Sequence, residues 1–375
     1  MGFILQLPKT LSGEKPSGEK PSGEKPSEEK PSGETPPEER LSGALTDSID
    51  AIISGGYLQS GLIHGFGLGS PPPDLLETPP AHPKGPLLIF LNHTASAADR
   101  RVVEDSFRDA WIILSSAFTA STSASASAVS THSTRSNVPA FFTGTWGATV
   151  LAGTKQYVLG ANHVLASNGR GKGAPVMSPG MGDQTDGGAT VGDVAEFVEF
   201  QHPLGRYIPN VAPPRIWWND VDCALAESKT IPTALSVAAG IPIGDAGQDN
   251  QIRKNGRTTG LTKSQVHSTN WYGVLDFSFG SFCFQNLGAA YSPVEPAFAA
   301  PGDSGALVIQ DAIGSGPTAI PTTPTAVGLL MARAYRFDSN TGAFAGYTVV
   351  WCPMTAVRDQ LAAKVNATLS FIPQS

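Results

Sequence analysis

The chain has 375 residues, of which 40% are hydrophobic and 15% are charged, and its formal net charge is −7 at pH 7. This length allows one large or two ordinary domains with a packed core. The acidic balance argues against nucleic acid as a partner, and no apolar run is long enough to predict a membrane span.

Residues 1–40 are predicted to form a disordered, low-complexity tail. Between about Ser12 and Pro37 the motif Ser-Gly-Glu-Lys-Pro recurs with a five-residue period. Such a segment has almost no apolar surface to bury, and its regular prolines block helix and sheet. A role as a tether or as an array of partner-binding motifs remains an alternative.

Residues 41–116 are expected to form a small α/β unit. Apolar runs predict strands at 61–69, 87–91 and 111–114, and the segment 97–107 has helical spacing. On that helix the residues expected to share one apolar face are Val102, Val103 and Phe107.

The first of these strands contains three alternating glycines, Gly65, Gly67 and Gly69. A nucleotide-binding loop is one interpretation, but the spacing is not that of the dinucleotide fingerprint, and prolines 71–73 follow where a helix should begin. Strand glycines at a point of close packing are the favoured interpretation.

Residues 117–137 are rich in Ser, Ala and Thr and are predicted to be a flexible linker to a main domain, 138–375. Three segments of that domain carry the residue types of acyl-transfer catalysis. His163 follows one apolar run, Asp222 precedes another, and Ser304 lies between Gly302 and Gly305. A serine attacks a carbonyl when a base removes its proton and nearby donors hold the oxyanion.

Taken singly, each segment has an ordinary interpretation. His163 could be a packed histidine, Asp222 a residue that hydrogen-bonds at the start of a strand, and 302–305 a turn between strands. The three occur in the order His, Asp, Ser, with gaps of 222−163 = 59 and 304−222 = 82 residues. Because this is one of the three chain orders in which a catalytic triad recurs, catalysis is favoured.

Two further segments make the chain resemble bacterial chymotrypsin-fold (trypsin-like) serine peptidases over about residues 138–370. Residues 144–150 are similar to the family's first hairpin and read GTWGATV. Residues 254–262 are similar to the segment that opens its second barrel and read KNGRTTGLT. The resemblance implies a mainly β fold, a double six-stranded antiparallel β-barrel with a C-terminal helix.

The resemblance also implies a role for each residue of the triad. His163 would be the general base, Asp222 its orienting carboxylate and Ser304 the nucleophile, with the N–H groups of Gly302 and Ser304 as the oxyanion hole. Asp220 is the alternative orienter, because residues i and i+2 share a face of a strand. In the family the orienting aspartate begins the pattern D-x-A-[LIV], and the residue of this chain that matches it is Asp222, at the start of DCAL.

Two apolar sets fit the same fold. The first set would lie in the middle of the first barrel and comprises Val191, Val194, Phe197 and Val198. The second would form one face of a closing helix and comprises Met354, Val357, Leu361 and Val365.

The chain departs from the digestive members of the family at two places. No Arg-Ile-Val-Gly-Gly junction precedes the first barrel, so we expect Asp303 to make local hydrogen bonds instead of pairing with a new N-terminus. Phe298 stands where trypsins carry an aspartate in the specificity pocket, which argues against substrates with Lys or Arg. We therefore expect small apolar residues before the scissile bond. Acidic residues are the second choice, through Arg333 at the pocket rim, unless Arg333 is a solvated surface residue.

The chain has three cysteines, Cys223, Cys283 and Cys352, which cannot all pair within one chain. None lies in a C-x-x-C motif, so no metal site is predicted. The low, odd count favours a reducing compartment, and residues 1–7 are too short an apolar patch for a signal peptide. The sequence thus favours a cytoplasmic location.

The function that these patterns favour is hydrolysis of peptide bonds through an acyl-enzyme on Ser304, with protein or peptide substrates and no cofactor. A catalytically silent barrel used as a binding module is the main alternative. Esterase activity on small acyl substrates is a third.

Deletion of residues 1–40 should leave thermal stability and active-site labelling unchanged, because this composition cannot contribute to a core. Melting temperature and labelling by a serine-reactive probe, measured for the full and the shortened chain, check this. A clear drop in melting temperature would show instead that the tail packs against the rest of the protein.

Overall fold

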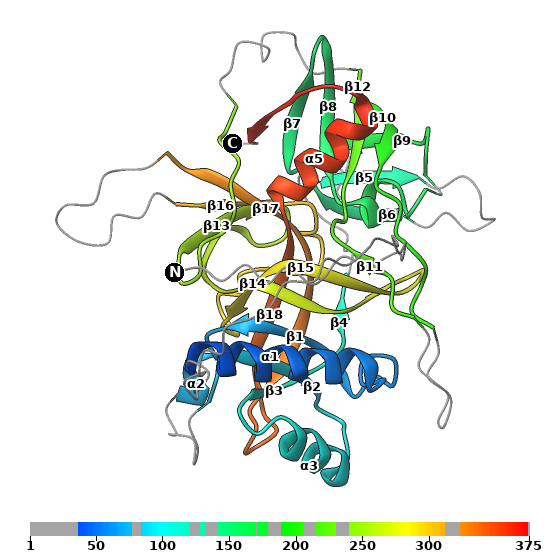
Figure 1. Ribbon diagram of the computed structural model, residues 1–375. Helices are drawn as coiled ribbons and strands as arrows, with labels where there is room; N and C mark the ends of the chain where they lie inside the picture. Colours follow the sequence, from blue (N-terminus) through cyan, green and yellow to red (C-terminus); the bar gives the residue numbers. More distant parts are fainter. Residues whose placement is uncertain are drawn as a thin grey trace, which may run out of the picture. The chain divides into compact units, whose positions relative to one another are not determined.

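The computed structural model describes residues 37–76, 84–120, 128–132, 141–169, 171–178, 189–205, 215–229, 240–311 and 323–373. By its contacts the chain divides into two compact units, Met1–Ala44 and Leu45–Ser375. Most of the predicted tail and most of the predicted linker lie outside the described residues. The second unit contains two β-sheets and a small number of helices (Figure 1).

The larger sheet has eleven strands among the described residues, and most of its neighbouring strands are antiparallel. The parallel pairs are β2–β3, β4–β14 and β11–β15. Its strands are β1 (Ile63–Gly69), β2 (Leu87–Asn92), β3 (Trp111–Ser115), β4 (Phe118–Thr119), β11 (Trp218–Asn219), β13 (Gln251–Gly256), β14 (Gly260–Phe277), β15 (Gly280–Ser292), β16 (Leu307–Gln310), β17 (Thr325–Phe337) and β18 (Phe344–Pro353).

The smaller sheet has eight strands in the described part of the chain, in the order β19-β7-β8-β12-β10-β9-β5-β6, all antiparallel. Its strands are β5 (Ala128–His132), β6 (Phe141–Thr145), β7 (Ala148–Ala152), β8 (Lys155–Gly160), β9 (Pro175–Ser178), β10 (Ala189–Phe197), β12 (Ala224–Ser228) and β19 (Leu369–Pro373). Strand β5 lies inside the segment predicted to be a linker, where it pairs with β6 and β9.

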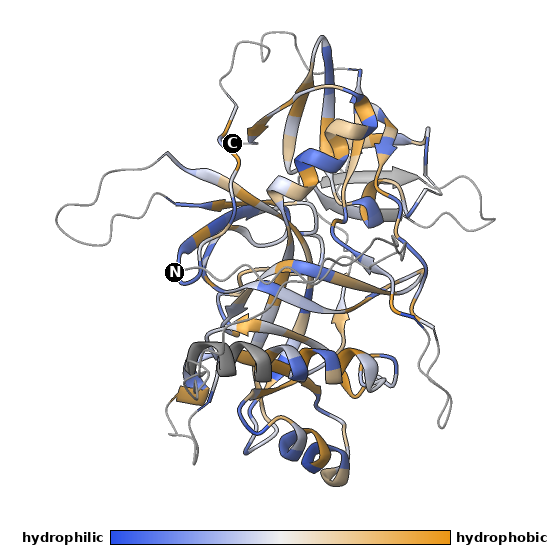
Figure 2. Cartoon of the chain, in the orientation of Figure 1, coloured by the Kyte–Doolittle hydropathy of each residue, from blue (hydrophilic) through white to orange (hydrophobic). Residues whose placement is uncertain are grey.

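The helices are α1 (Pro37–Ser54), α2 (Pro73–Leu76), α3 (Ala97–Ser106), α4 (Asn162–Leu165) and α5 (Met354–Val365). Within the described residues, none is both long and apolar enough to cross a membrane. Helix α3 begins where the Ser96 side chain caps the N–H of Asp99, and it carries hydrophobic and hydrophilic residues side by side (Figure 2). Val103 and Phe107 are buried as predicted, but Val102 is 52% exposed, so its placement on the apolar face was wrong.

The prediction of a mainly β chain with a helix near its end is confirmed. Met354, Val357 and Leu361 of α5 are fully buried, and the chain then returns as β19 to pair with β7. Among the described residues the strands form sheets of eleven and eight strands and not two sets of six, and β1–β4 belong to the larger sheet. The segment expected to be a separate α/β unit therefore shares a continuous sheet with the main domain.

The strand glycines of β1 lie where β14 approaches most closely. A Cβ atom on Gly65 would lie 2.4 Å from the ring of Trp271, and one on Gly69 would lie 1.9 Å from the carbonyl oxygen of His267. Trp271 is completely buried and also contacts the rings of Phe90 and Phe118. The close-packing interpretation of these glycines is confirmed.

Two histidines lie on the paired strands β1 and β14. Burial lowers the pKa of His64 to about 4, an effect that the nearby Asp276 partly opposes. Burial also lowers the pKa of His267 to about 4, and the charge of Arg336 adds to the shift. Both groups are therefore neutral in the folded protein at pH 7 but bind a proton more readily once the chain unfolds.

Stability should fall as the pH falls from about 6.5, the unfolded value, towards 4, because the unfolded chain then takes up protons that the folded chain excludes. Each histidine contributes at most about 1.4 kcal/mol per pH unit in this window. Urea denaturation at several pH values should show a flatter slope for His267→Gln than for wild type. Replacing the exposed His202 by glutamine should leave the slope unchanged, and equal slopes for all three proteins would contradict the prediction.

Candidate active site

Ser304 lies in a tight loop immediately before β16. Gly302 has φ 98° and Gly305 has φ 92°, a left-handed backbone that side chains rarely adopt. At Gly305 a Cβ atom would also lie 2.5 Å from the carbonyl oxygen of Thr145. The N–H groups of Gly302 and Ser304 donate to no carbonyl of the described residues. Within the described structure the loop therefore has two backbone donors without an acceptor, beside a serine that is 6% exposed.

The Asp303 side chain, next to Ser304 in the same loop, is fully buried. Its carboxylate pairs with the ammonium of Lys254 at 3.0 Å, and the Lys254 side chain is also fully buried. It accepts further hydrogen bonds from the N–H groups of Thr258, Thr259 and Ala300 and from the Thr259 hydroxyl. The local hydrogen bonds expected for Asp303 are present, and Lys254 is an additional ionic partner that the sequence did not predict.

His163 and Asp222 meet because two strands of the smaller sheet end side by side. Gly160 at the end of β8 pairs with Ala224 at the start of β12, so the residues just beyond them lie together. The backbone N–H of His163 donates to Asp222 Oδ1 at 2.9 Å, and His163 Nδ1 contacts Asp222 Oδ2. Both side chains are at most 3% exposed.

Asp222 is held from the other side by the larger sheet. Its backbone N–H donates to Cys352 Sγ at 3.0 Å. Asp220, the alternative orienter, instead accepts a hydrogen bond from Gln285 at 3.0 Å. Of the two aspartates, the one in contact with His163 is therefore Asp222.

The Ser304 loop is tied to the smaller sheet by Thr145, the last residue of β6. Its N–H donates to the carbonyl of Ser304 at 2.8 Å, and its hydroxyl donates to the carbonyl of Gly302 at 3.0 Å. The same hydroxyl accepts from the N–H of Arg257. One residue of the smaller sheet thus fixes the loop that carries Ser304 next to the sheet that carries His163.

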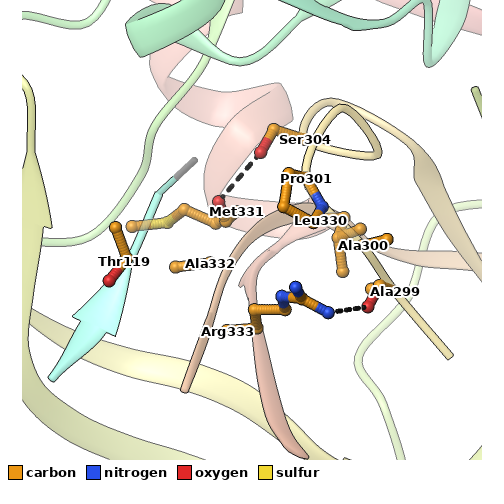
Figure 3. A pocket seen from close by; sticks show the side chains of 9 residues that line it. All are labelled: Thr119, Ala299, Ala300, Pro301, Ser304, Leu330, Met331, Ala332 and Arg333. Atoms are coloured by element: carbon orange, nitrogen blue, oxygen red, sulfur yellow. Dashed lines mark hydrogen bonds between the residues drawn. The ribbon is translucent and has the colours of Figure 1, made fainter. Parts of the chain in front are cut away.

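The Ser304 hydroxyl donates to the carbonyl oxygen of Met331 at 3.2 Å (Figure 3). His163 Nε2 is buried and has no hydrogen-bond partner among the described residues. The hydrogen bond between Ser304 and His163 that a triad uses is therefore not formed in this structure.

A shallow pocket opens beside Ser304 (Figure 3). Its lining residues come from β4, the Ser304 loop and β17, and they are Thr119, Ala299, Ala300, Pro301, Ser304, Leu330, Met331, Ala332 and Arg333. Arg333 is among these lining residues, whereas Phe298 is not. The Phe298 side chain is fully buried in a core cluster with Ile252, Val266 and Trp351.

The orientation of Phe298 has a local cause, and it keeps this residue out of the pocket beside Ser304, where the sequence had placed it. Its N–H donates to the Ser292 hydroxyl, and its carbonyl accepts from the Thr262 hydroxyl, both at 2.7 Å. These bonds turn the ring into the core and leave Ala299 and Ala300 to face the pocket.

The three cysteines are buried and unpaired. Burial raises the pKa of the Cys283 thiol to about 12 and those of Cys223 and Cys352 well above the ordinary value. No cluster of three potential metal ligands occurs within the described ranges.

Sequence reasoning missed three contributors to this site: Lys254, Thr145 and Thr119. Lys254 and Thr145 lie in the segments KNGRTTGLT and GTWGATV, so their surroundings were identified but not their contacts. Thr119 lies in the predicted linker and reaches the pocket because β4 pairs with β17 at Arg333. No local pattern signals that pairing.

Comparison with known proteins gives structural neighbours only. No family model matches the sequence, and no curated protein does either. Thermobifida fusca protease A is similar with 15% identity and a TM-score of 0.35, covering 68% of this chain and 100% of its own. A chymotrypsin from Cellulomonas bogoriensis has the same identity and TM-score and covers 67% of this chain and 99% of its own. These neighbours are bacterial serine proteases.

Lys254→Met should lower the free energy of unfolding by about 3–5 kcal/mol, because it leaves a buried carboxylate without its charged partner. Chemical denaturation measures this. The matched control is Lys155→Met, which breaks the exposed ion pair with Glu227 and should cost no more than about 1 kcal/mol. A similar small loss for both variants would mean that Asp303 does not need the ammonium.

Proposed function

We propose that this protein is a serine endopeptidase that cleaves peptide bonds through an acyl-enzyme on Ser304. The observation that carries the proposal is the pair of contacts between His163 and Asp222, through the backbone N–H and through Nδ1. A carboxylate at Nδ1 leaves Nε2 of a neutral imidazole free to accept a proton. That nitrogen is the buried atom without a partner described above.

Catalysis begins when the Ser304 hydroxyl turns from the Met331 carbonyl to His163 Nε2. The imidazole then takes the hydroxyl proton as Oγ bonds to the substrate carbonyl carbon. Asp222 keeps the imidazole in the correct tautomer and stabilises its protonated form.

The negative charge that develops on the substrate oxygen would be held by the N–H groups of Gly302 and Ser304. Neither N–H has an acceptor among the residues that the structure describes, and this and the left-handed backbone of Gly302 support the role. Protonated His163 gives its proton to the leaving amine. A water molecule, activated by the same imidazole, then hydrolyses the ester on Ser304 and restores the enzyme.

A fluorophosphonate probe should label the wild-type protein, and Ser304→Ala should abolish the label. His163→Ala and Asp222→Asn should each slow peptide hydrolysis by about three to four orders of magnitude while the fold is retained. Ser60→Ala, which removes an exposed hydroxyl, is the matched control and should label like wild type.

The outcomes separate the alternatives. A folded wild-type protein that takes no label would favour a catalytically silent binding module. Labelling combined with cleavage of activated esters but of no peptide would favour an esterase. Both results are read against Ser304→Ala, which should be inactive in either assay.

A further inference from the structure

The pocket beside Ser304 contains a single charged side chain. Among its lining residues Ala299, Ala300, Leu330 and Ala332 are apolar, whereas Arg333 carries a guanidinium. Figure 3 shows the Arg333 side chain reaching to the carbonyl oxygen of Ala299 in the loop before Ser304, on the far side from the Ser304 hydroxyl. An apolar pocket with one cation corresponds to the second choice of the sequence analysis, acidic substrates through Arg333, and not to its first choice of small apolar residues.

The guanidinium is fixed in this position by three neighbours. Its Nη1 donates to the carbonyl oxygen of Ala299 at 3.1 Å. Its central carbon lies 4.4 Å from the ring centre of Tyr347 and 5.6 Å from that of Tyr335. Arg333 is half-buried, so it is not the freely solvated surface arginine that the sequence left open.

Arg333 has no carboxylate within ion-pair distance in the described part of the chain. Asp303, the carboxylate nearest to the nucleophile in sequence, is engaged by Lys254. A guanidinium has five N–H donors, and the bond to Ala299 uses one of them. A charged group partly removed from water, with spare donors and no counter-ion, gains most from a ligand that supplies a carboxylate.

We propose that Arg333 selects substrates with an acidic side chain, Glu or Asp, on the acyl side of the scissile bond. This inference rests on the proposed peptidase function, because it assigns the pocket next to Ser304 to the residue whose carbonyl is attacked. The substrate carboxylate binds the free edge of the guanidinium, and its methylene groups contact the alanines of the pocket. A Lys or Arg substrate is rejected because its cation would meet Arg333.

The test compares kcat/KM for matched peptides that differ only at the residue before the scissile bond: Glu, Asp, Gln, Ala, Leu or Arg. The Glu/Gln pair isolates the charge, since the two side chains have nearly the same shape. We expect the better acidic peptide to exceed Gln by about tenfold to hundredfold, as a charge-assisted hydrogen bond provides. The Arg peptide should be cut most slowly.

Two substitutions separate charge from shape. Arg333→Gln should bring the Glu/Gln ratio close to one while Ala and Leu peptides are still cut, and Arg333→Lys should keep part of the preference. Arg358→Gln on α5, which removes a partly exposed charge outside the pocket, is the control for net charge and should keep the wild-type ratio.

Fluorophosphonate labelling distinguishes the two levels of failure. A wild-type protein that labels at Ser304 but cuts Gln, Ala or Leu peptides as fast as Glu and Asp would overturn the role of Arg333 and leave the peptidase function standing. A Glu/Gln ratio that survives in Arg333→Gln would also overturn it. A folded protein that neither labels nor cleaves any peptide would overturn both.

Discussion

The geometry around the nucleophile depends on one buried ion pair, that between Lys254 and Asp303. Asp303 is adjacent to Ser304 and collects donors from β13, from the turn that follows it and from Ala300. These donors hold the carboxylate on one side of the loop, which leaves the Ser304 hydroxyl free to line the pocket on the other side. The cation is the ammonium of Lys254 in β13 of the same chain. The ion pair therefore forms, and the loop takes its shape, as the chain folds.

A second constraint joins the two sheets. His163 and Asp222 come from the ends of paired strands in the smaller sheet, whereas Ser304 precedes a strand of the larger one. Thr145 bonds to two carbonyls of the nucleophile loop, and Cys352 of β18 bonds to the backbone of Asp222. The smaller sheet therefore positions the Ser304 loop, and the larger sheet positions Asp222. The candidate site forms only when the two sheets are packed together.

The sequence predicted those features that local patterns determine. Strands β1, β2 and β3 coincide with apolar runs bounded by Gly, Pro or polar residues, and α5 has an apolar face with helical spacing. His163 and Asp222 could be singled out because His163 directly follows one apolar run and Asp222 directly precedes another. Long-range contacts could not be predicted in this way. The burial of Lys254 depends on a partner 49 residues away. Whether Phe298 or Ala299 lines the pocket depends on two hydrogen bonds that the Ser292 and Thr262 hydroxyls make to the backbone of Phe298.

The sharing of the larger sheet by the N-terminal strands determines what a proteolytic cut after these strands would do to the protein. β1 covers the edge of β14, while β3 and β4 pair with β17. Dissociation of residues 45–120 after a cut would leave two long strand edges unpaired and would expose Trp271, which is a state prone to aggregation. A nick after this segment would instead produce a two-chain protein whose halves stay associated through main-chain hydrogen bonds.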